Sequence, residues 1–255
     1  MYILNTKLIL NTPPESFTNA SKYPGTLAHM AYQIGEDFHL YRANIPLSLK
    51  GGLMVLGDKT FKNSGDPEVL GNEIIKECVH RGFDGVFLDF EASNPLLHTF
   101  TAVLSGRLNR QGGQLYLTEK YAGDSDYANI MISTAISGGS LTARLQEASS
   151  IYGKDRLCLD VERVRMDFCL PSLDGAGTPL SSRELYALTK SYHPQPYFSQ
   201  ELCAYYFTFT DKYGSHFVLY DDAGSIRKKI QLATRLSIPA VMLLYPEVED
   251  VVELL

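Results

Sequence analysis

Two acidic residues, Asp89 and Glu91, end a short apolar run in the segment GFDGVFLDFE at 82–91. If this run is a strand, its side chains alternate, so Phe87, Asp89 and Glu91 share one face. A carboxyl pair on an inward face is costly unless it is hydrogen-bonded or functional. One of two close acids keeps its proton more easily, which suits a general acid. The structural alternative is that Glu91 caps the helix that follows Asn94.

Helices and short apolar runs alternate along the chain, which predicts a parallel sheet covered by helices. The best-defined helix is 67–81, because Asp66 can cap it and Gly82 can end it. Further helices are predicted at 95–110, 141–152, 182–192 and 223–236. Near-continuous apolar runs predict buried strands at 53–57, 85–91, 114–118, 128–134, 156–161 and 240–245. Two more, around 2–10 and 38–45, would complete a set of eight.

This order of elements predicts an α/β fold, a (β/α)8 TIM-type barrel that forms a single catalytic-type domain over 1–255. The alternation breaks at 165–220, where a helix and the hairpin sequence AYYFTFTDKYGSHFVLY predict a small α+β insertion between strand 7 and the last helix. Active sites of such barrels lie at the C-terminal mouth. Asp89 and Glu91 are therefore expected there.

Composition narrows the classes of partner. The formal net charge of −6 argues against nucleic acid, which calls for a basic face. No segment reaches the roughly 18 apolar residues of a membrane span. The N-terminus lacks the basic start of a signal peptide, which predicts a cytoplasmic protein, with association to a spore or cell wall as the alternative. The four cysteines and six histidines show no metal spacing, so neither a metal nor another cofactor is predicted.

Other polar and aromatic residues also follow predicted strands. Asp58 is either a cap or an acid in the cleft, and a cap is favoured. Glu119 and Tyr121 follow the strand at 114–118, and a cleft position is as plausible for them as a structural one. Asp160 and Glu162 repeat the spacing of Asp89 and Glu91, and could either form salt bridges with nearby arginines or contact a substrate.

The segment DGVFLDFE at 84–91 resembles the signature of glycoside hydrolase family 18, the chitinase-like barrels, which reads Asp-Gly-x-Asp-x-Asp-x-Glu. Asp84, Gly85, Asp89 and Glu91 match it. The similarity covers roughly 50–250 in order and looks closest to the branch associated with spore cortex and peptidoglycan. It implies that Glu91 is the general acid and that Asp89 orients the acetamido group of the substrate. The acetamido oxygen itself would attack the anomeric carbon, so that no enzyme nucleophile is needed.

Three positions depart from the family pattern. Phe87 stands where the signature has its inner Asp. The strand at 128–134 ends in Ser133 and Thr134, where the family has Tyr and Asp. Leu244 and Tyr245 occupy the place of a Trp at the cleft floor, and Tyr245 could serve as a stacking face for a sugar.

These observations leave three functions open. The first is a hydrolase acting on β-linked N-acetylglucosamine glycans, with peptidoglycan or spore cortex favoured over chitin. Its cleft would include Glu91, Asp89, Tyr245, Glu119, Tyr121, Ser133 and Asp58. The second is a catalytically inactive, lectin-like barrel that binds the same glycans. The third is a structural protein without a sugar site, which an exposed apolar face on the insertion would favour. The oligomeric state is not predicted.

Overall fold

The structure is a computed structural model that describes residues 6–43, 50–171 and 176–255. Eight parallel strands form a closed barrel in the order β1-β14-β8-β7-β6-β5-β4-β2, and β1 also pairs with β2. The predicted α/β fold, a (β/α)8 TIM-type barrel, is confirmed. The barrel strands are β1 Lys7–Thr12, β2 Thr26–Ile34, β4 Leu53–Gly57, β5 Gly85–Asp89, β6 Gln114–Thr118, β7 Asn129–Ser133, β8 Leu157–Val161 and β14 Ala240–Leu244.

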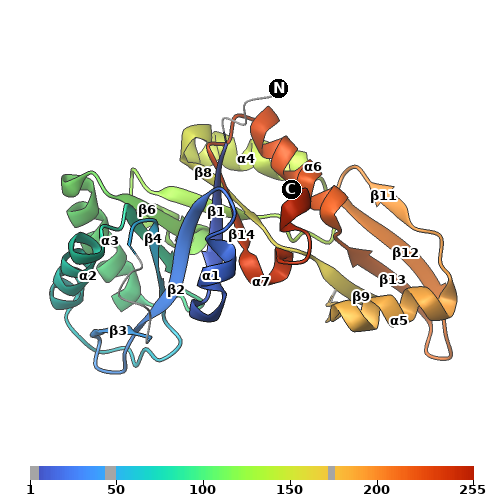
Figure 1. The fold of residues 1–255 in the computed structure, drawn as a ribbon, viewed down its shortest axis with the longest axis horizontal. Coiled ribbons are helices and arrows are strands. Elements are labelled where there is room, and N and C mark those ends of the chain that lie inside the picture. Colours follow the sequence, from blue (N-terminus) through green and yellow to red (C-terminus); the bar gives the residue numbers. More distant parts are fainter. Residues whose placement is uncertain (1–5, 44–49, 172–175) are drawn as a thin grey trace.

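Helices connect and cover these strands (Figure 1). They are α1 Phe17–Ala20, α2 Pro67–Arg81, α3 Pro95–Gln111, α4 Leu141–Tyr152, α5 Ser182–Tyr192, α6 Ala223–Arg235 and α7 Tyr245–Val248. The 3₁₀ turns in the described residues are η1 Pro14–Ser16, η2 Glu119–Asp124, η3 Lys154–Arg156 and η4 Val252–Leu254. The predicted caps of α2 are present, because the Asp66 side chain accepts from the Glu68 backbone N–H and Gly82 adopts φ 66°. In the part of the chain described, no helix is long and apolar enough to span a membrane.

The first strands differ from the sequence prediction. The second barrel strand is β2, whereas the segment predicted at 38–45 provides only β3 (Leu40–Arg42), which pairs antiparallel with β2 outside the barrel. Residues 44 and 45 of that prediction, and 2–5 of the first strand, lie outside the described residues. The prediction of 38–45 as a barrel strand was wrong because His29 interrupts the apolar pattern of β2. This histidine is nevertheless buried, and its Nε2 lies 3.1 Å from the Gly51 carbonyl oxygen.

The barrel separates two apolar cores. The larger one lies between the strands and the surrounding helices. The smaller one fills the barrel interior and consists of Ile9, Ala28, Leu53, Val55, Phe87, Tyr116, Met131, Cys158, Ala240 and Met242, with Met30 packed against it. Because strand side chains alternate, the residue two positions after each of these along a strand also points inward. The interior core therefore determines which side chains enter the mouth.

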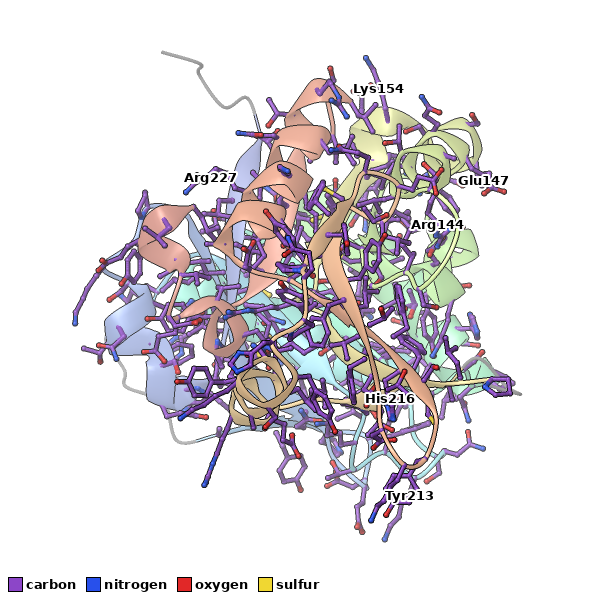
Figure 2. The ribbon with its side chains drawn as sticks, turned by 90° about the vertical axis from the view of Figure 1, so that its right-hand side faces the viewer. Arg144, Glu147, Lys154, Tyr213, His216 and Arg227 are labelled. Carbon is purple, nitrogen blue, oxygen red and sulfur yellow. The ribbon has the colours of Figure 1, made fainter. Side chains whose placement is uncertain are left out.

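A five-stranded antiparallel sheet and helix α5 lie between β8 and α6, to one side of the barrel and away from α2 and α3 (Figure 1). Its order is β10-β9-β13-β12-β11. The strands are β9 Arg165–Leu170, β10 Thr178–Pro179, β11 Tyr197–Ser199, β12 Ala204–Thr210 and β13 Ser215–Tyr220. The hairpin predicted from the sequence is β12–β13. Figure 2 shows Tyr213 at its tip and His216 just behind it.

A buried ion pair ties the two ends of this segment to α6. Lys229 Nζ donates to Asp221 Oδ2 over 2.6 Å, and both side chains are fully buried. The other Asp221 oxygen accepts from Ser225 Oγ at 2.7 Å. Val164, just before β9, donates its N–H to Asp221 Oδ2 at 2.9 Å, and its carbonyl accepts from the Asp221 N–H at 2.8 Å. The entrance and exit of the antiparallel sheet are thus joined at one carboxylate.

Replacing Lys229 with methionine should destabilise the protein by about 3–5 kcal/mol, because the Asp221 carboxylate would remain buried without its cation. Lys76→Met, on the exposed face of α2, is the matched control and should change stability by no more than about 0.5 kcal/mol. The measurement is the free energy of unfolding by urea. Equal effects of the two substitutions would show that the buried pair does not hold this junction.

Candidate active site at the mouth of the barrel

The C-terminal ends of the strands surround a partly polar mouth. Its floor includes inward-facing residues two positions beyond members of the interior core, among them Asn11, Asp89, Thr118, Ser133, Asp160 and Leu244. The two carboxyl groups belong to β5 and β8. Among the described residues, neither of them has a hydrogen bond or an ion pair. Both acids are therefore available to a ligand.

The surroundings of the two acids raise the pKa of each carboxyl. Burial raises the pKa of the Asp89 carboxyl, and the charges of Glu91 and Asp58 raise it further. Burial also raises the pKa of Asp160, to about 7, with added contributions from the charges of Glu162 and Asp89. Asp89 is therefore close enough to affect Asp160 from another strand. Near neutral pH, the mouth contains one acid that is partly protonated.

Two further polar atoms in the mouth have no partner. Asn11 is only 8% exposed, and its Oδ1 is buried without a hydrogen bond within the described ranges. Thr118 Oγ1, on β6, is buried and unpartnered in the same way. Buried polar atoms normally find partners, so such exceptions call for an explanation. The sequence analysis missed Asn11, although its position two residues after the apolar Ile9 was the available signal.

Glu91 lies beyond the strand, on the loop that leads to α3. The sequence predicted that Phe87, Asp89 and Glu91 share one face of a strand. This holds for Phe87 and Asp89, but β5 ends at Asp89, so Glu91 is not part of the strand. The Glu91 and Ala92 backbone N–H groups donate to the two Asp58 carboxylate oxygens, each at 3.0 Å. The Glu91 carbonyl accepts from Lys120 Nζ at 2.6 Å. The main chain of this loop is thus fixed on both sides.

The Glu91 side chain itself is open to solvent. It is 74% exposed, and its Oε1 lies 3.8 Å from Lys59 Nζ. An exposed ion pair of this kind contributes little to stability. Asp58, by contrast, is buried, and both of its carboxylate oxygens accept hydrogen bonds from backbone N–H groups of the loop. This is the capping role favoured from its sequence position. Asp58 positions Glu91, and Glu91 is free to meet a ligand.

Other residues predicted for the cleft have structural partners. Tyr121 is fully buried and donates its hydroxyl to the Ala92 carbonyl at 2.7 Å. Tyr245 is also buried, and its hydroxyl lies 3.4 Å from Glu249 Oε1. Glu119 forms an ion pair with Arg144 of α4. In this conformation neither tyrosine offers a ring face to a sugar.

On the β7 side of the mouth, Ser133 is held by Glu162. Ser133 Oγ donates to Glu162 Oε1 at 2.5 Å and accepts from the Ala135 N–H at 3.0 Å. Within the described ranges, Asp160 and Glu162 form no salt bridge with an arginine, because Arg163 and Arg165 pair instead with Asp250 and Glu247 of the chain after β14. Of the two interpretations of Asp160, the substrate contact therefore remains as a proposal.

A groove continues from this side of the mouth, between the barrel and the antiparallel sheet. Its volume is about 530 Å³. Its walls include Ser137, Glu162 and Leu244 from the barrel side and Met166, Phe168 and Leu219 from β9 and β13. The register pairs Met166 with Leu219 and Phe168 with Phe217, so these four side chains share one face of the sheet. That face forms one wall of the groove.

Aromatic rings extend this face away from the barrel. Phe168 and Phe217 have ring centroids 6.2 Å apart, Phe217 and Tyr206 are stacked at 5.2 Å, and Tyr206 and Tyr197 are stacked at 5.7 Å. Tyr197, on the edge strand β11, is exposed. The sequence contains no tryptophan, and this row is not evident from the sequence because its four rings come from four strands.

Among the described residues, no group of three or more His, Cys, Asp or Glu side chains could hold a metal ion. The mouth presents three carboxyl groups, those of Asp89, Asp160 and Glu91. Asp89 and Asp160 can accept or donate a proton within it, and Glu91 can do so at its rim.

No protein-family model matches the sequence. No curated protein matches it either. Solved structures match nearly the whole chain at low identity. The spore cortex-lytic enzyme SleL of Bacillus cereus is 18% identical with a TM-score of 0.68, over 97% of this chain and 74% of that one. A glycoside hydrolase family 18 N-acetylglucosaminidase from Paenibacillus barengoltzii is 14% identical with a TM-score of 0.67, over 97% and 98%.

A family 18 chitinase variant from Cycas revoluta, solved in complex with (GlcNAc)4, is 13% identical with a TM-score of 0.61, over 97% of each chain. Identities this low establish the fold. The resemblance suggested by the segment at 84–91 is thus confirmed in three dimensions: the chain has the (β/α)8 fold of the glycoside hydrolase family 18 structures.

Proposed function

We propose that this protein is a divergent member of glycoside hydrolase family 18 that hydrolyses β-linked N-acetylglucosamine glycans. Glu91 is the general acid, and Asp89 orients the acetamido group. The observation that carries this proposal is the arrangement at the end of β5. Asp89 lies in the mouth without a protein partner among the described residues, and Glu91 stands above it on a loop fixed by Asp58 and Lys120.

The chemistry requires these two carboxyl groups, the substrate and a water molecule. Glu91 gives its proton to the glycosidic oxygen as the bond to the anomeric carbon breaks. The acetamido oxygen attacks that carbon and forms a cyclic intermediate, while Asp89 accepts a hydrogen bond from the acetamido N–H. Water then attacks the anomeric carbon, and Glu91 recovers a proton from it. The product keeps the configuration of the substrate.

A bound glycan would supply the desolvation that Glu91 lacks in the free protein. A sugar that covers the rim of the mouth would remove this exposed carboxyl from water and separate it from Lys59. Desolvation favours the protonated form of a carboxyl, which is the form that an acid catalyst needs. Substrate binding would thus give Glu91 the water-shielded surroundings that the proposed acid needs.

The groove supports a polymeric substrate. Sugar rings stack on aromatic faces, and the row Phe168, Phe217, Tyr206 and Tyr197 continues outward from the groove. The neighbours named above include a spore cortex-lytic enzyme, an N-acetylglucosaminidase and a chitinase. Among glycans with N-acetylglucosamine, we favour peptidoglycan or spore cortex, as the sequence resemblance does.

Two observations favour the alternative of a barrel that binds these glycans without cleaving them. Phe87 occupies the barrel interior below Asp89, where the family signature has a carboxylate. The Ser133 hydroxyl is engaged by Glu162. The third function, a structural role, draws on exposed tyrosines of the 165–220 segment, namely Tyr186, Tyr192, Tyr197 and Tyr213. The open groove favours either glycan function over that one.

Glu91→Gln should lower the release of reducing sugar from N-acetylglucosamine oligomers and cortex peptidoglycan by about 100-fold or more, because an amide cannot donate the proton. Glu147→Gln, on the exposed face of α4 (Figure 2), is the control and should keep native turnover. Binding of (GlcNAc)4 to native protein and to both variants should be similar. Binding without any turnover by native protein would select the lectin-like alternative.

Asp58→Ala should lower kcat about 10- to 100-fold with a smaller change in KM, because the loop would lose both acceptors that fix the Glu91 main chain. Asp58→Asn keeps one oxygen as an acceptor and should retain more activity. Steady-state kinetics on a soluble oligomer measures both effects. A kcat of Asp58→Ala equal to that of native protein would remove Asp58 from the positioning of Glu91.

A further inference from the structure

Asp160 is the polar group of the mouth that the proposed reaction leaves unused. It ends the inward face of β8, directly beside Ser133 of β7 in the strand register. Ser133 already donates to Glu162, whereas Asp160 has no hydrogen bond or ion pair among the described residues. Asp160 is therefore the hydrogen-bonding group available on this side of the mouth.

An independent observation points to a ligand here. The Asn11 side chain is more than nine-tenths buried, faces the same mouth from β1, and leaves Oδ1 unpartnered within the described part of the chain. Leaving a buried acceptor unsatisfied costs free energy that a ligand donor can recover. Asn11, Asp89 and Asp160 thus offer hydrogen bonds from three different strands toward one space.

The groups around Asp160 decide its charge. Glu162 follows it on its own chain segment, Cys158 lies two residues below it, and Asp89 faces it from β5. The adjacent strands β7 and β14 present Met131, Ser133, Met242 and Leu244 inward, none of which titrates near neutral pH, and β6 presents Tyr116. Burial and the two nearby acids raise the Asp160 pKa to about 7. Below that pH the group is a neutral O–H donor.

We propose that Asp160 is a positioning residue that forms a hydrogen bond to the acetamido carbonyl of the bound sugar through its carboxyl O–H, while Asp89 accepts from the N–H of the same amide. This inference rests on the proposed function, because it assigns a second contact to the same N-acetylated ligand. The two acids then match the two ends of one amide: a donor meets its oxygen, and an acceptor meets its N–H.

Loss of the Asp160 proton removes the donor and places a second negative charge beside Asp89. Binding should therefore be strongest at mildly acidic pH and should weaken as the pH rises above about 7. One linked proton sets a limit of about tenfold in Kd per pH unit. Asp160→Asn isolates the part of the effect that belongs to Asp160, because burial and the charges of Glu91 and Asp58 raise the pKa of Asp89 as well.

The test is calorimetric titration of (GlcNAc)4 into full-length Glu91→Gln protein, which cannot turn it over, at pH 5.5, 7.0 and 8.5. The expected Kd rises up to about 15-fold between pH 7.0 and 8.5, because Asp160 is already half deprotonated at pH 7.0. Adding Asp160→Asn, whose amide donates at every pH, should flatten this dependence and keep binding. Adding Asp160→Leu should weaken binding about 10- to 100-fold at pH 5.5. Asp155→Asn, in η3 just before β8, is the matched control.

Unfolding experiments without ligand test the titration itself. The Asp160 carboxyl has a pKa near 4 in the unfolded chain and about 7 in the folded protein. Its contribution to stability is therefore fully present below pH 4 and is lost as the pH rises to about 7. The denaturation midpoint of Asp160→Asn should thus exceed that of native protein at pH 8, with a smaller difference at pH 4.5. The raised pKa of His216, whose Nδ1 lies 3.0 Å from both Asp167 oxygens, affects both proteins equally.

The outcomes separate the two proposals. The role of Asp160 would be overturned if (GlcNAc)4 bound the Glu91→Gln protein equally well at every pH, or if adding Asp160→Leu left binding unchanged. Either result would leave the proposed function in place. Failure of (GlcNAc)4 to bind at any pH, with native protein also unable to cleave it, would overturn both. Binding that weakens above pH 7 and becomes flat in Asp160→Asn supports both.

Discussion

The pairing of β1 with β2 closes the sheet, and the mouth depends on that closure. Parallel strands of a barrel all end on one side, and alternation turns every second side chain inward. An apolar layer of residues such as Ile9 and Phe87 fills the interior, so the next inward residue of each strand enters the mouth. Asn11, Asp89 and Asp160 are distant in sequence and meet because the barrel is closed between β1 and β2.

The groove depends on a second constraint, the carboxylate of Asp221. A buried ion pair is weak evidence of net stability, because both charges lose their hydration. In this protein the ion pair fixes the relative positions of the segments that it joins. Asp221 holds Val164 at the entrance of the antiparallel sheet and Lys229 on α6, so β9 and β13 leave the barrel from one fixed point. Met166 and Leu219 lie within two residues of that point, which explains why they form the groove wall nearest the mouth.

Local signals predicted most of the fold, and long-range contacts account for what they missed. The helices at 67–81 and 141–152 have the predicted bounds because polar caps and a following glycine define both ends. Strand β2 was missed because His29 becomes compatible with a core only through its contact with Gly51. The inward direction predicted for Asp89 followed from alternation, whereas the exposed position of Glu91 follows from Asp58, which takes the loop N–H groups after the strand has ended.

Phe87 changes how the mouth distributes its charge. A carboxylate at this position would lie in the dry interior core beneath Asp89, beside Tyr116 and Met131, and would repel it. The ring instead completes the apolar layer, so the acids remain at the level of the mouth. The inward acid that Asp89 affects is then on another strand, at Asp160. Two acids on different strands of a closed barrel point toward its axis from different directions, so they approach a ligand in the mouth from different sides.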